Sequence, residues 1–282
     1  MKKAVLIATA LALCPLSFAQ TPDAVASAQK QAAAVLAQKS AAAVTIKSLA
    51  TSTCSFTFTS GTGNSFLKYC VTVNGNITQF QTPAGVEHIA IGSFGEGYGF
   101  CDLNFGVAYD DYADFGDSGN WLNATVASSS PTSVKIVRTT ADGIWTLTQT
   151  IAQVASTGSA KITMTLKNNT AVDRSVELVR YADVDADDSV INNFDSTFNS
   201  AFGWDPSGTT DNFGMMLQDV NTTAFTHLGL VQNVAFGPDP CHVFRNVVSG
   251  TQIGVDGSVL LSYVIEIPPR ASRTVTVSYK GM

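Results

Sequence analysis

Residues 160–183 read AKITMTLKNNTAVDRSVELVRYAD, and this stretch decides the fold class. Apolar and polar residues alternate over 160–167 and again over 174–183, with a turn-like polar segment between the two runs. A period of two places one side chain in the core and the next in solvent, which is the pattern of a β-strand with one buried face. We therefore expect two strands here, in a protein of mainly antiparallel β-structure.

The same period recurs from about residue 50 to the C-terminus, with Gly, Asn, Asp, Pro and Ser between the runs. Residues 71–78 add an Asn-Gly pair between alternating runs, which indicates a hairpin. Many short strands at this spacing are typical of a sandwich or barrel. We find neither a repeat nor a linker, so residues 49–282 are expected to form one all-β domain, a large and mostly antiparallel β-sandwich. The other expected strands are 53–59, 66–73, 86–92, 133–138, 144–151, 225–236, 258–267 and 273–279.

The first residues have the composition of a secretory signal. Two lysines precede an apolar run over 4–16, and residues 17–19 put small side chains where a signal peptidase cuts. We expect residues 1–19 to be removed and the protein to be secreted or periplasmic. This run is too short to span a bilayer and no later one is long enough, so no transmembrane segment is expected.

Residues 20–48 are rich in Ala, Gln, Lys and Val, a composition that favours a helix. The apolar face of such a helix is thin. Three interpretations stay open: the arm packs on the domain, stands out as an exposed stalk, or is partly disordered.

Charge limits the choice of partner. Only 13% of the residues are charged, and without the two lysines of the signal 14 basic residues face 22 acidic ones, a net charge of −8. Such a surface repels polyphosphate, so we expect neither nucleic acid nor an anionic membrane as partner.

Four cysteines follow the expected signal. Cys54 and Cys70 lie in two strand-like runs joined by a turn-rich segment, so a hairpin centred on Thr62 sets them opposite each other. Cys101 then pairs with Cys241. The spacings differ from those of a zinc site, so we expect two disulfides, which fits a protein outside the reducing cytoplasm.

Several of these runs resemble a known family. Four segments follow the strand order of the large β-sandwiches related to galactose mutarotase: VTVNGNITQFQTPAGVEHIAIG (71–92), GEGYGFCD (95–102), KITMTLKNNTAVDRSVELVRYADVDAD (161–187) and IEIPPRASRTVTVSY (265–279). The resemblance implies a sandwich that handles carbohydrate. The paired catalytic His and the Glu base of the mutarotases find no residue-by-residue match here, so no site residue follows from it.

An acidic turn is the most distinctive local pattern. Asp183, Asp185 and Asp187 alternate with Val184 and Ala186. If their carboxylates converge, the spacing suits a hard cation such as calcium, with Asp195 as a further ligand. A solvated acidic loop and a catalytic carboxylate pair are the other interpretations. The sequence requires no cofactor, and calcium is the one that it suggests.

A second stretch, residues 109–117, combines aromatic and acidic side chains. Aromatic rings bordered by carboxylates suit sugars, because sugar C–H faces stack on rings while hydroxyls bond to oxygens. The alternative is a long loop whose aromatic residues pin it to the sandwich. Trp145 lies inside a strand and is expected in the core. The candidate carbohydrate-binding residues are Tyr109, Tyr112, Asp114, Trp121 and Trp204, the last of which lies in a separate turn-rich region.

Catalytic signatures are absent from the sequence. His88, His227 and His242 have no partner at a diagnostic spacing. Residues 95–99 (GEGYG) read as a flexible turn or bulge, in which Glu96 is the residue of chemical interest.

We expect a secreted β-sandwich that binds extracellular carbohydrate, and we lean against an enzyme. One alternative is a structural or adhesive cell-surface subunit that self-associates through residues 20–47. The other is a sugar-active enzyme of the epimerase or lyase type, in which carboxylates would act with His88 or His227.

Overall fold

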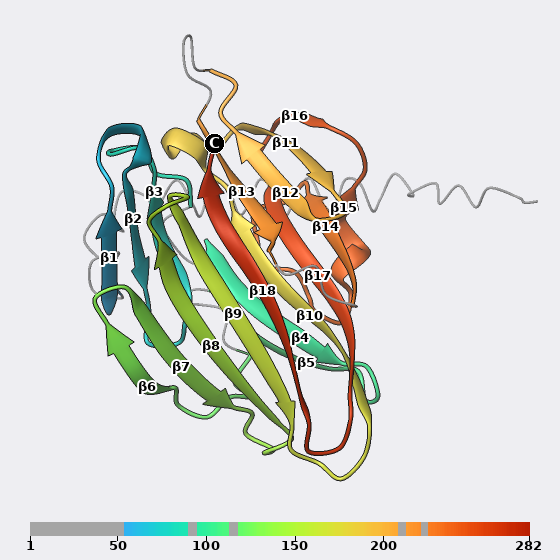
Figure 1. The fold of residues 1–282 in the computed structure, drawn as a ribbon. Coiled ribbons are helices and arrows are strands. Elements are labelled where there is room, and N and C mark those ends of the chain that lie inside the picture. The colour runs from blue at the N-terminus through green and yellow to red at the C-terminus, as the bar shows by residue number, and fades with distance from the viewer. Residues whose placement is uncertain (1–53, 90–94, 113–117, 208–212, 221–224) are drawn as a thin grey trace, which may run out of the picture.

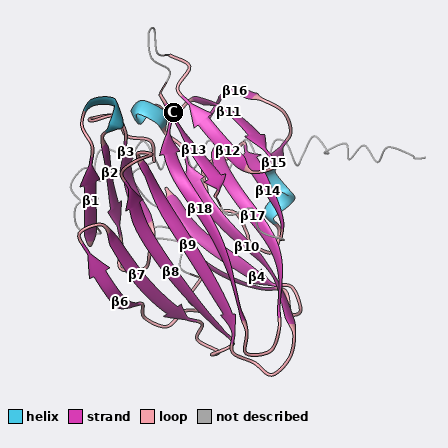
Figure 2. Ribbon diagram, in the orientation of Figure 1, coloured by secondary structure: helices cyan, strands magenta, loops and turns pink. Residues whose placement is uncertain are grey.

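The computed structural model describes residues 54–89, 95–112, 118–207, 213–220 and 225–282 (Figure 1). The expected signal segment and the Ala-rich arm lie outside these residues. Strands make up most of the described chain, and the helices are three short 3-10 turns (Figure 2). None of the described helices is long and apolar enough to cross a membrane. The 3-10 turns are η1 (Gly63–Ser65), η2 (Ala186–Asp188) and η3 (Val243–Asn246).

The largest sheet has nine strands that lie side by side in Figure 1. Its order is β16 (Gln252–Val255), β11 (Asn192–Thr197), β12 (Ser200–Trp204), β13 (Gly214–Asp219), β18 (Ser272–Gly281), β9 (Ser159–Asn168), β8 (Trp145–Val154), β7 (Ser133–Thr139) and β6 (Thr125–Ser130). All its neighbouring strands are antiparallel, as the short connections between consecutive strands require.

A six-stranded sheet packs against the nine-stranded one, and a three-stranded sheet lies beside them. The six strands are, in order, β15 (Val247–Val248), β14 (Thr226–Gln232), β17 (Ser258–Ile267), β10 (Arg174–Asp183), β4 (Glu96–Asp102) and β5 (Val107–Tyr112). The three are β1 (Phe56–Ser60), β2 (Leu67–Val71) and β3 (Ile77–Gln81).

The core lies between the two large sheets. Along β9, Ile162, Met164 and Leu166 are fully buried, while the residues between them face outward. This alternation is the period of two seen in the sequence. Trp145 is fully buried, as predicted, and its Nε1 donates a hydrogen bond to Asp102 at 3.2 Å. The expected all-β class and antiparallel sandwich are therefore confirmed.

Two of the expected strands have accurate limits. The strands expected over 174–183 and 258–267 have those bounds in the structure, and they pair with each other along their whole length. The run expected over 86–92 forms only two isolated bridges within the described residues, at Glu87 and at Ile89.

Two segments were predicted wrongly. Residues 95–99, expected as a flexible turn or bulge, contain the start of strand β4 at Glu96, and residues 109–112 of the stretch 109–117, for which a long loop was one interpretation, lie in β5. Glycine explains the first error, because a Cβ on Gly97 would lie 2.2 Å from the Asp111 carbonyl oxygen. Gly97 therefore allows a close approach of strands rather than a turn.

Both predicted disulfides are present, Cys54–Cys70 and Cys101–Cys241. The argument for the first was only partly right: the hairpin pairs Thr57, not Cys54, with Cys70. Cys54 precedes the first residue of β1 and reaches Cys70 from there, with a Cα–Cα distance of 5.5 Å.

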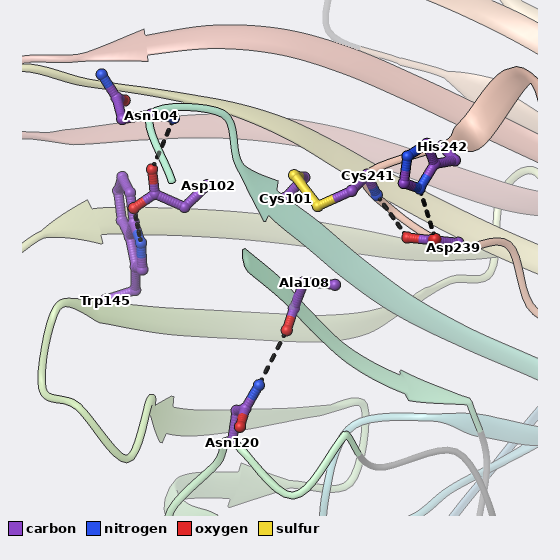
Figure 3. Close-up of a disulfide and its surroundings, with 9 residues drawn as sticks. All are labelled: Cys101, Asp102, Asn104, Ala108, Asn120, Trp145, Asp239, Cys241 and His242. Atoms are coloured by element: carbon purple, nitrogen blue, oxygen red, sulfur yellow. Dashed lines mark hydrogen bonds and ion pairs between the residues drawn. A yellow bond between two sulfur atoms is a disulfide. The ribbon is translucent and has the colours of Figure 1, made fainter. Parts of the chain in front are cut away.

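The long-range disulfide, Cys101–Cys241, fastens the segment around Cys241 over the outward face of the six-stranded sheet, and this segment is called here the covering segment (Figure 3). Asp239 holds the turn before Cys241, because its carboxylate accepts bonds from the Cys241 amide at 2.9 Å and from His242 at 2.7 Å. Beneath this segment a small apolar cluster includes Tyr112, Tyr181 and Leu260.

Candidate functional site

A pair of aromatic rings faces outward from the nine-stranded sheet on β12. Phe202 and Trp204 are two residues apart on one face of the strand, and their rings stack with centroids 5.9 Å apart and planes 29° apart. Both side chains are partly exposed. The residue paired with Trp204 is Gly214, so no side chain of β13 covers that position. The two rings form an apolar platform on an otherwise polar sheet face.

Polar groups stand in the same row as this platform. Asp195 on β11 and Met216 on β13 are the direct neighbours of Phe202, and Lys280 on β18 is the neighbour of Met216. Directly opposite residues have Cβ atoms about 5 Å apart. The Asp195 carboxylate accepts a hydrogen bond from the Thr251 hydroxyl at 2.8 Å. A carboxylate thus lies beside Phe202, and an ammonium lies on the other side in the same row, beyond Met216.

The other predicted sugar-binding aromatic residues lie inside the protein. Tyr109, Tyr112 and Trp121 are 2%, 4% and 8% exposed. The Trp121 indole packs edge-on against Phe100, and the Arg138 guanidinium lies 4.8 Å from its ring centroid. These rings offer no open face to a ligand. Asp114 lies outside the described residues.

The acidic turn brings together part of the predicted metal set. Carboxylate oxygens of Asp183, Asp185 and Asp256 lie within 4.8 Å of one another, and the structure contains no ion. Asp256 was not predicted, because it is 71 residues beyond Asp185 and reaches the group only through the fold. Asp187 is exposed and does not belong to the group, and neither does Asp195, which lies on β11 beside the aromatic platform.

A buried acid and a buried imidazole lie next to this turn. The segment from Glu87 to Ile89 runs antiparallel to the turn, with hydrogen bonds from the Asp185 amide to the His88 carbonyl and from the Asp187 amide to the Glu87 carbonyl. Burial raises the pKa of Glu87 to about 7, although three backbone amides bond to its Oε1. Burial likewise lowers the pKa of His88.

Sequence reasoning missed three buried ion pairs, of which two join β10 to β4 within the six-stranded sheet and one joins β5 to β7 of the nine-stranded sheet. Arg180 bonds to Glu96, Arg138 to Asp111 and Arg174 to Asp102, and all six side chains are buried. The Tyr279 hydroxyl also donates to Glu96 at 2.8 Å, and Arg180 donates to Gln149 at 2.7 Å. Burial raises the pKa of Glu96, while Arg180 opposes that shift. Each of these carboxylates is bonded directly to an Arg, so none of the three is a free acid or base for catalysis.

The other two histidines, His227 and His242, have different surroundings. His227 stacks on Tyr263 with ring centroids 5.5 Å apart, and its Nε2 lies 2.8 Å from the Asn199 amide oxygen. His242 is exposed and bonded to Asp239. Neither His227 nor His242 stands with two carboxylates around one shared position.

No protein-family model matches the chain. No curated protein matches it by sequence. Solved structures do share its fold. A bacterial glucoamylase in complex with acarbose superimposes with a TM-score of 0.53 at 10% identity, over 81% of this chain and 32% of that one. This chain thus spans about a third of the glucoamylase's length.

Two further solved structures are a galactose mutarotase-like protein from Lactobacillus casei and a galactose mutarotase related enzyme from Lactobacillus acidophilus. The first has a TM-score of 0.48 at 9% identity over 80% of this chain and 100% of its own. The second has a TM-score of 0.42 at 6% identity over 80% and 97%. Neither similarity assigns a site residue to this chain.

Proposed function

We propose that this domain is exported and binds extracellular carbohydrate at the platform formed by Phe202 and Trp204. The observation that carries the proposal is the stacked, partly exposed ring pair with Asp195 and Lys280 in its row. Aromatic faces bind the C–H faces of sugars, and adjacent charged groups bond to sugar hydroxyls. The glucoamylase, which carries acarbose, supports a role with sugars for this fold.

Binding is placed ahead of turnover because Glu87 and His88, the acid and the imidazole beside the acidic turn, are covered. Glu87 has a pKa that suits proton transfer near neutral pH, but it and His88 are 4% and 0% exposed. A sugar-active enzyme would need these groups in contact with its substrate. Self-association through residues 20–47 stays a prediction, since that arm lies outside the described residues.

A calcium ion at Asp183, Asp185 and Asp256 is the second part of the proposal. Three carboxylates within 4.8 Å suit a hard cation, which accepts oxygen ligands in a flexible arrangement. The ion would stabilise the end of β10 and act on carbohydrate binding only through the fold.

The test is a glycan-array screen with and without calcium, followed by titration of the best ligand. Trp204→Ala is expected to weaken binding by about 1 to 3 kcal/mol with folding retained, because one stacking face is lost. Trp145→Ala, matched in chemistry but buried, should instead cost about 3 to 5 kcal/mol of folding stability. Unchanged affinity of Trp204→Ala for every bound glycan would remove the platform from the proposal.

A further inference from the structure

The two outward sheet faces differ in charge. Five lysines lie within the described residues, and four of them are exposed on the outward face of the nine-stranded sheet: Lys135, Lys161, Lys167 and Lys280. On the described strands of this sheet, Asp195 is the one acidic residue that faces outward. Glu177 and Glu266 point the other way, from the six-stranded sheet. A chain with a net charge of −6 thus presents one basic face.

Three of these lysines form a diagonal line that leads to the aromatic platform, here called the lysine track. Lys135 on β7 pairs with Thr150 on β8, and Thr150 pairs with Thr163 on β9. Thr163 is two residues after Lys161, so Lys135 and Lys161 are separated by two strands across the sheet and by two residues along it. Lys161 pairs with Ser278, which is two residues before Lys280 on β18. Strand spacing and rise place consecutive lysines of the track about 12 Å and about 8 Å apart.

The last lysine of the track is linked to the platform through one residue, Met216. Lys280 pairs with Met216, and Met216 pairs with Phe202. The centre of this face carries threonine side chains, whose hydroxyl groups hydrogen-bond to one another, as those of Thr165 and Thr274 do at 2.8 Å. These threonines are Thr148, Thr150, Thr163, Thr165, Thr274 and Thr276.

We infer that the lysine track binds an anionic polysaccharide, one whose pyranose units carry carboxylate or sulfate groups, with a sugar unit stacked on Trp204. This inference deepens the proposed function and rests on it. Charge complementarity selects a polyanion, because the track is cationic on an acidic protein. The aromatic pair at its end selects sugar rings over a lipid surface. Wide spacing of the ammonium groups suits charges carried on separate sugar units.

The test measures binding of alginate, which carries carboxylates, heparin, which carries sulfates, and neutral dextran to the purified protein by calorimetry. We expect alginate or heparin to bind more tightly than dextran and to lose affinity as salt is added. The double variant Lys161→Gln/Lys280→Gln should bind the anionic polymer about 25-fold more weakly, about fivefold for each lysine. Because heparin carries carboxylates as well as sulfates, binding of alginate would show that carboxylates suffice, and binding of heparin without alginate would show that sulfates are needed.

Two matched variants control for net charge. Lys167→Gln removes a charge from the same face but away from the track, and Lys68→Gln removes one from β2 in the small sheet. Both should bind like the unmodified protein. Equal loss in all variants, no loss in the double variant, or equally tight binding of duplex DNA or anionic vesicles would overturn the inference. Dextran binding that depends on Trp204 but not on the track would overturn it and leave the proposed function standing.

Discussion

The raised pKa of Glu87 makes the folding stability of the protein depend on pH. Its side chain is 4% exposed, and its Oε1 accepts three backbone amide bonds. Such bonds favour the charged carboxylate, yet loss of water is the larger effect, and the pKa rises from 4.5 to about 7. The folded protein therefore holds a proton that the unfolded chain has released between these two values.

The sign of the resulting effect follows from linkage. A raised pKa means that the folded state binds more protons than the unfolded state between pH 4.5 and 7, so this residue lowers stability as pH rises through that window. Glu87→Gln cannot ionise, so its stability relative to the unmodified protein should increase by roughly 3 kcal/mol from pH 4 to pH 8. Urea unfolding at several pH values measures this difference. A constant difference across the window would show that Glu87 is ionised in the folded state already at low pH.

Ion pairs in the core carry a different lesson at the same scale. Arg180 and Glu96 are both fully buried, and their partners include the Tyr279 hydroxyl and the Ile77 amide. Removing water from two charges costs several kcal/mol, which their attraction offsets only when the remaining donors and acceptors are also bonded. Arg180 and Glu96 lie on neighbouring strands of the six-stranded sheet, and their bonds to Gln149 and Tyr279 tie that sheet to the nine-stranded one, so we expect this network to contribute more to the alignment of the sheets than to net stability.

Strand β4 shows what a sequence pattern can hide at the scale of an element. Its alternate residues Gly97 and Gly99 have no side chain, and its inward residue Glu96 is charged, so neither hydrophobic alternation nor strand propensity is visible. The glycines are needed because the main chain of β5 and Pro240 lie where a Cβ would stand. The composition is explained by the next strand, β5, and by Pro240, which is distant in the sequence.

Gly97→Ala tests this explanation. Its Cβ would lie 2.2 Å from the Asp111 oxygen and 2.6 Å from the Tyr112 Cα, so the strands must move apart, at a cost of about 3 kcal/mol, the upper end for an overfilled core. Gly106→Ala is the comparison. An added Cβ at Gly106 would have no atom within 4 Å, but the residue has a φ of +65°, so the expected loss of stability comes only from the left-handed backbone and is about 1 kcal/mol. Urea unfolding of both variants gives the two costs, and equal costs would mean that β5 gives way easily.

The end of β10 is the element that calcium should stabilise. If the ion bridges Asp183, Asp185 and Asp256, it relieves their mutual repulsion and stabilises the folded state by about 2.7 kcal/mol at a hundredfold excess over its dissociation constant. Melting temperature should rise from chelator to calcium, and less with magnesium, which needs a tighter octahedron.

Two variants separate the predicted ligands in that melt. Asp256→Asn should abolish the rise, whereas Asp195→Asn, on β11, should keep it. A melting temperature that is the same in chelator and in calcium would make this turn an ordinary acidic loop end.

Across the whole molecule, the sequence predicted what depends on local alternation and missed what depends on distant partners. Strands 174–183 and 258–267 were predicted to the residue because each is rich in apolar and β-branched residues and is bounded by turn-forming residues. Trp204 was predicted as exposed from its turn-rich context, but its stacking on Phe202 and the row of Asp195 and Lys280 needed the register of four strands. Tyr109 and Tyr112 were assigned to the stretch 109–117 as ligand or loop residues because the strand β5 was not recognised.

The two disulfides act on the whole molecule to different extents. Cys54–Cys70 closes a separation of 16 residues and Cys101–Cys241 one of 140. Loop-closure entropy predicts that they restrict the unfolded chain by about 3 and about 5 kcal/mol. The longer one also fastens the segment that covers Tyr112, Tyr181 and Leu260, so its loss should expose apolar surface as well. Replacing each pair by alanines and measuring urea unfolding should therefore give the larger loss for Cys101 and Cys241, with dye binding to the uncovered face. A larger loss for Cys54 and Cys70 would mean that the small sheet, rather than the covered face, limits the stability of the sandwich.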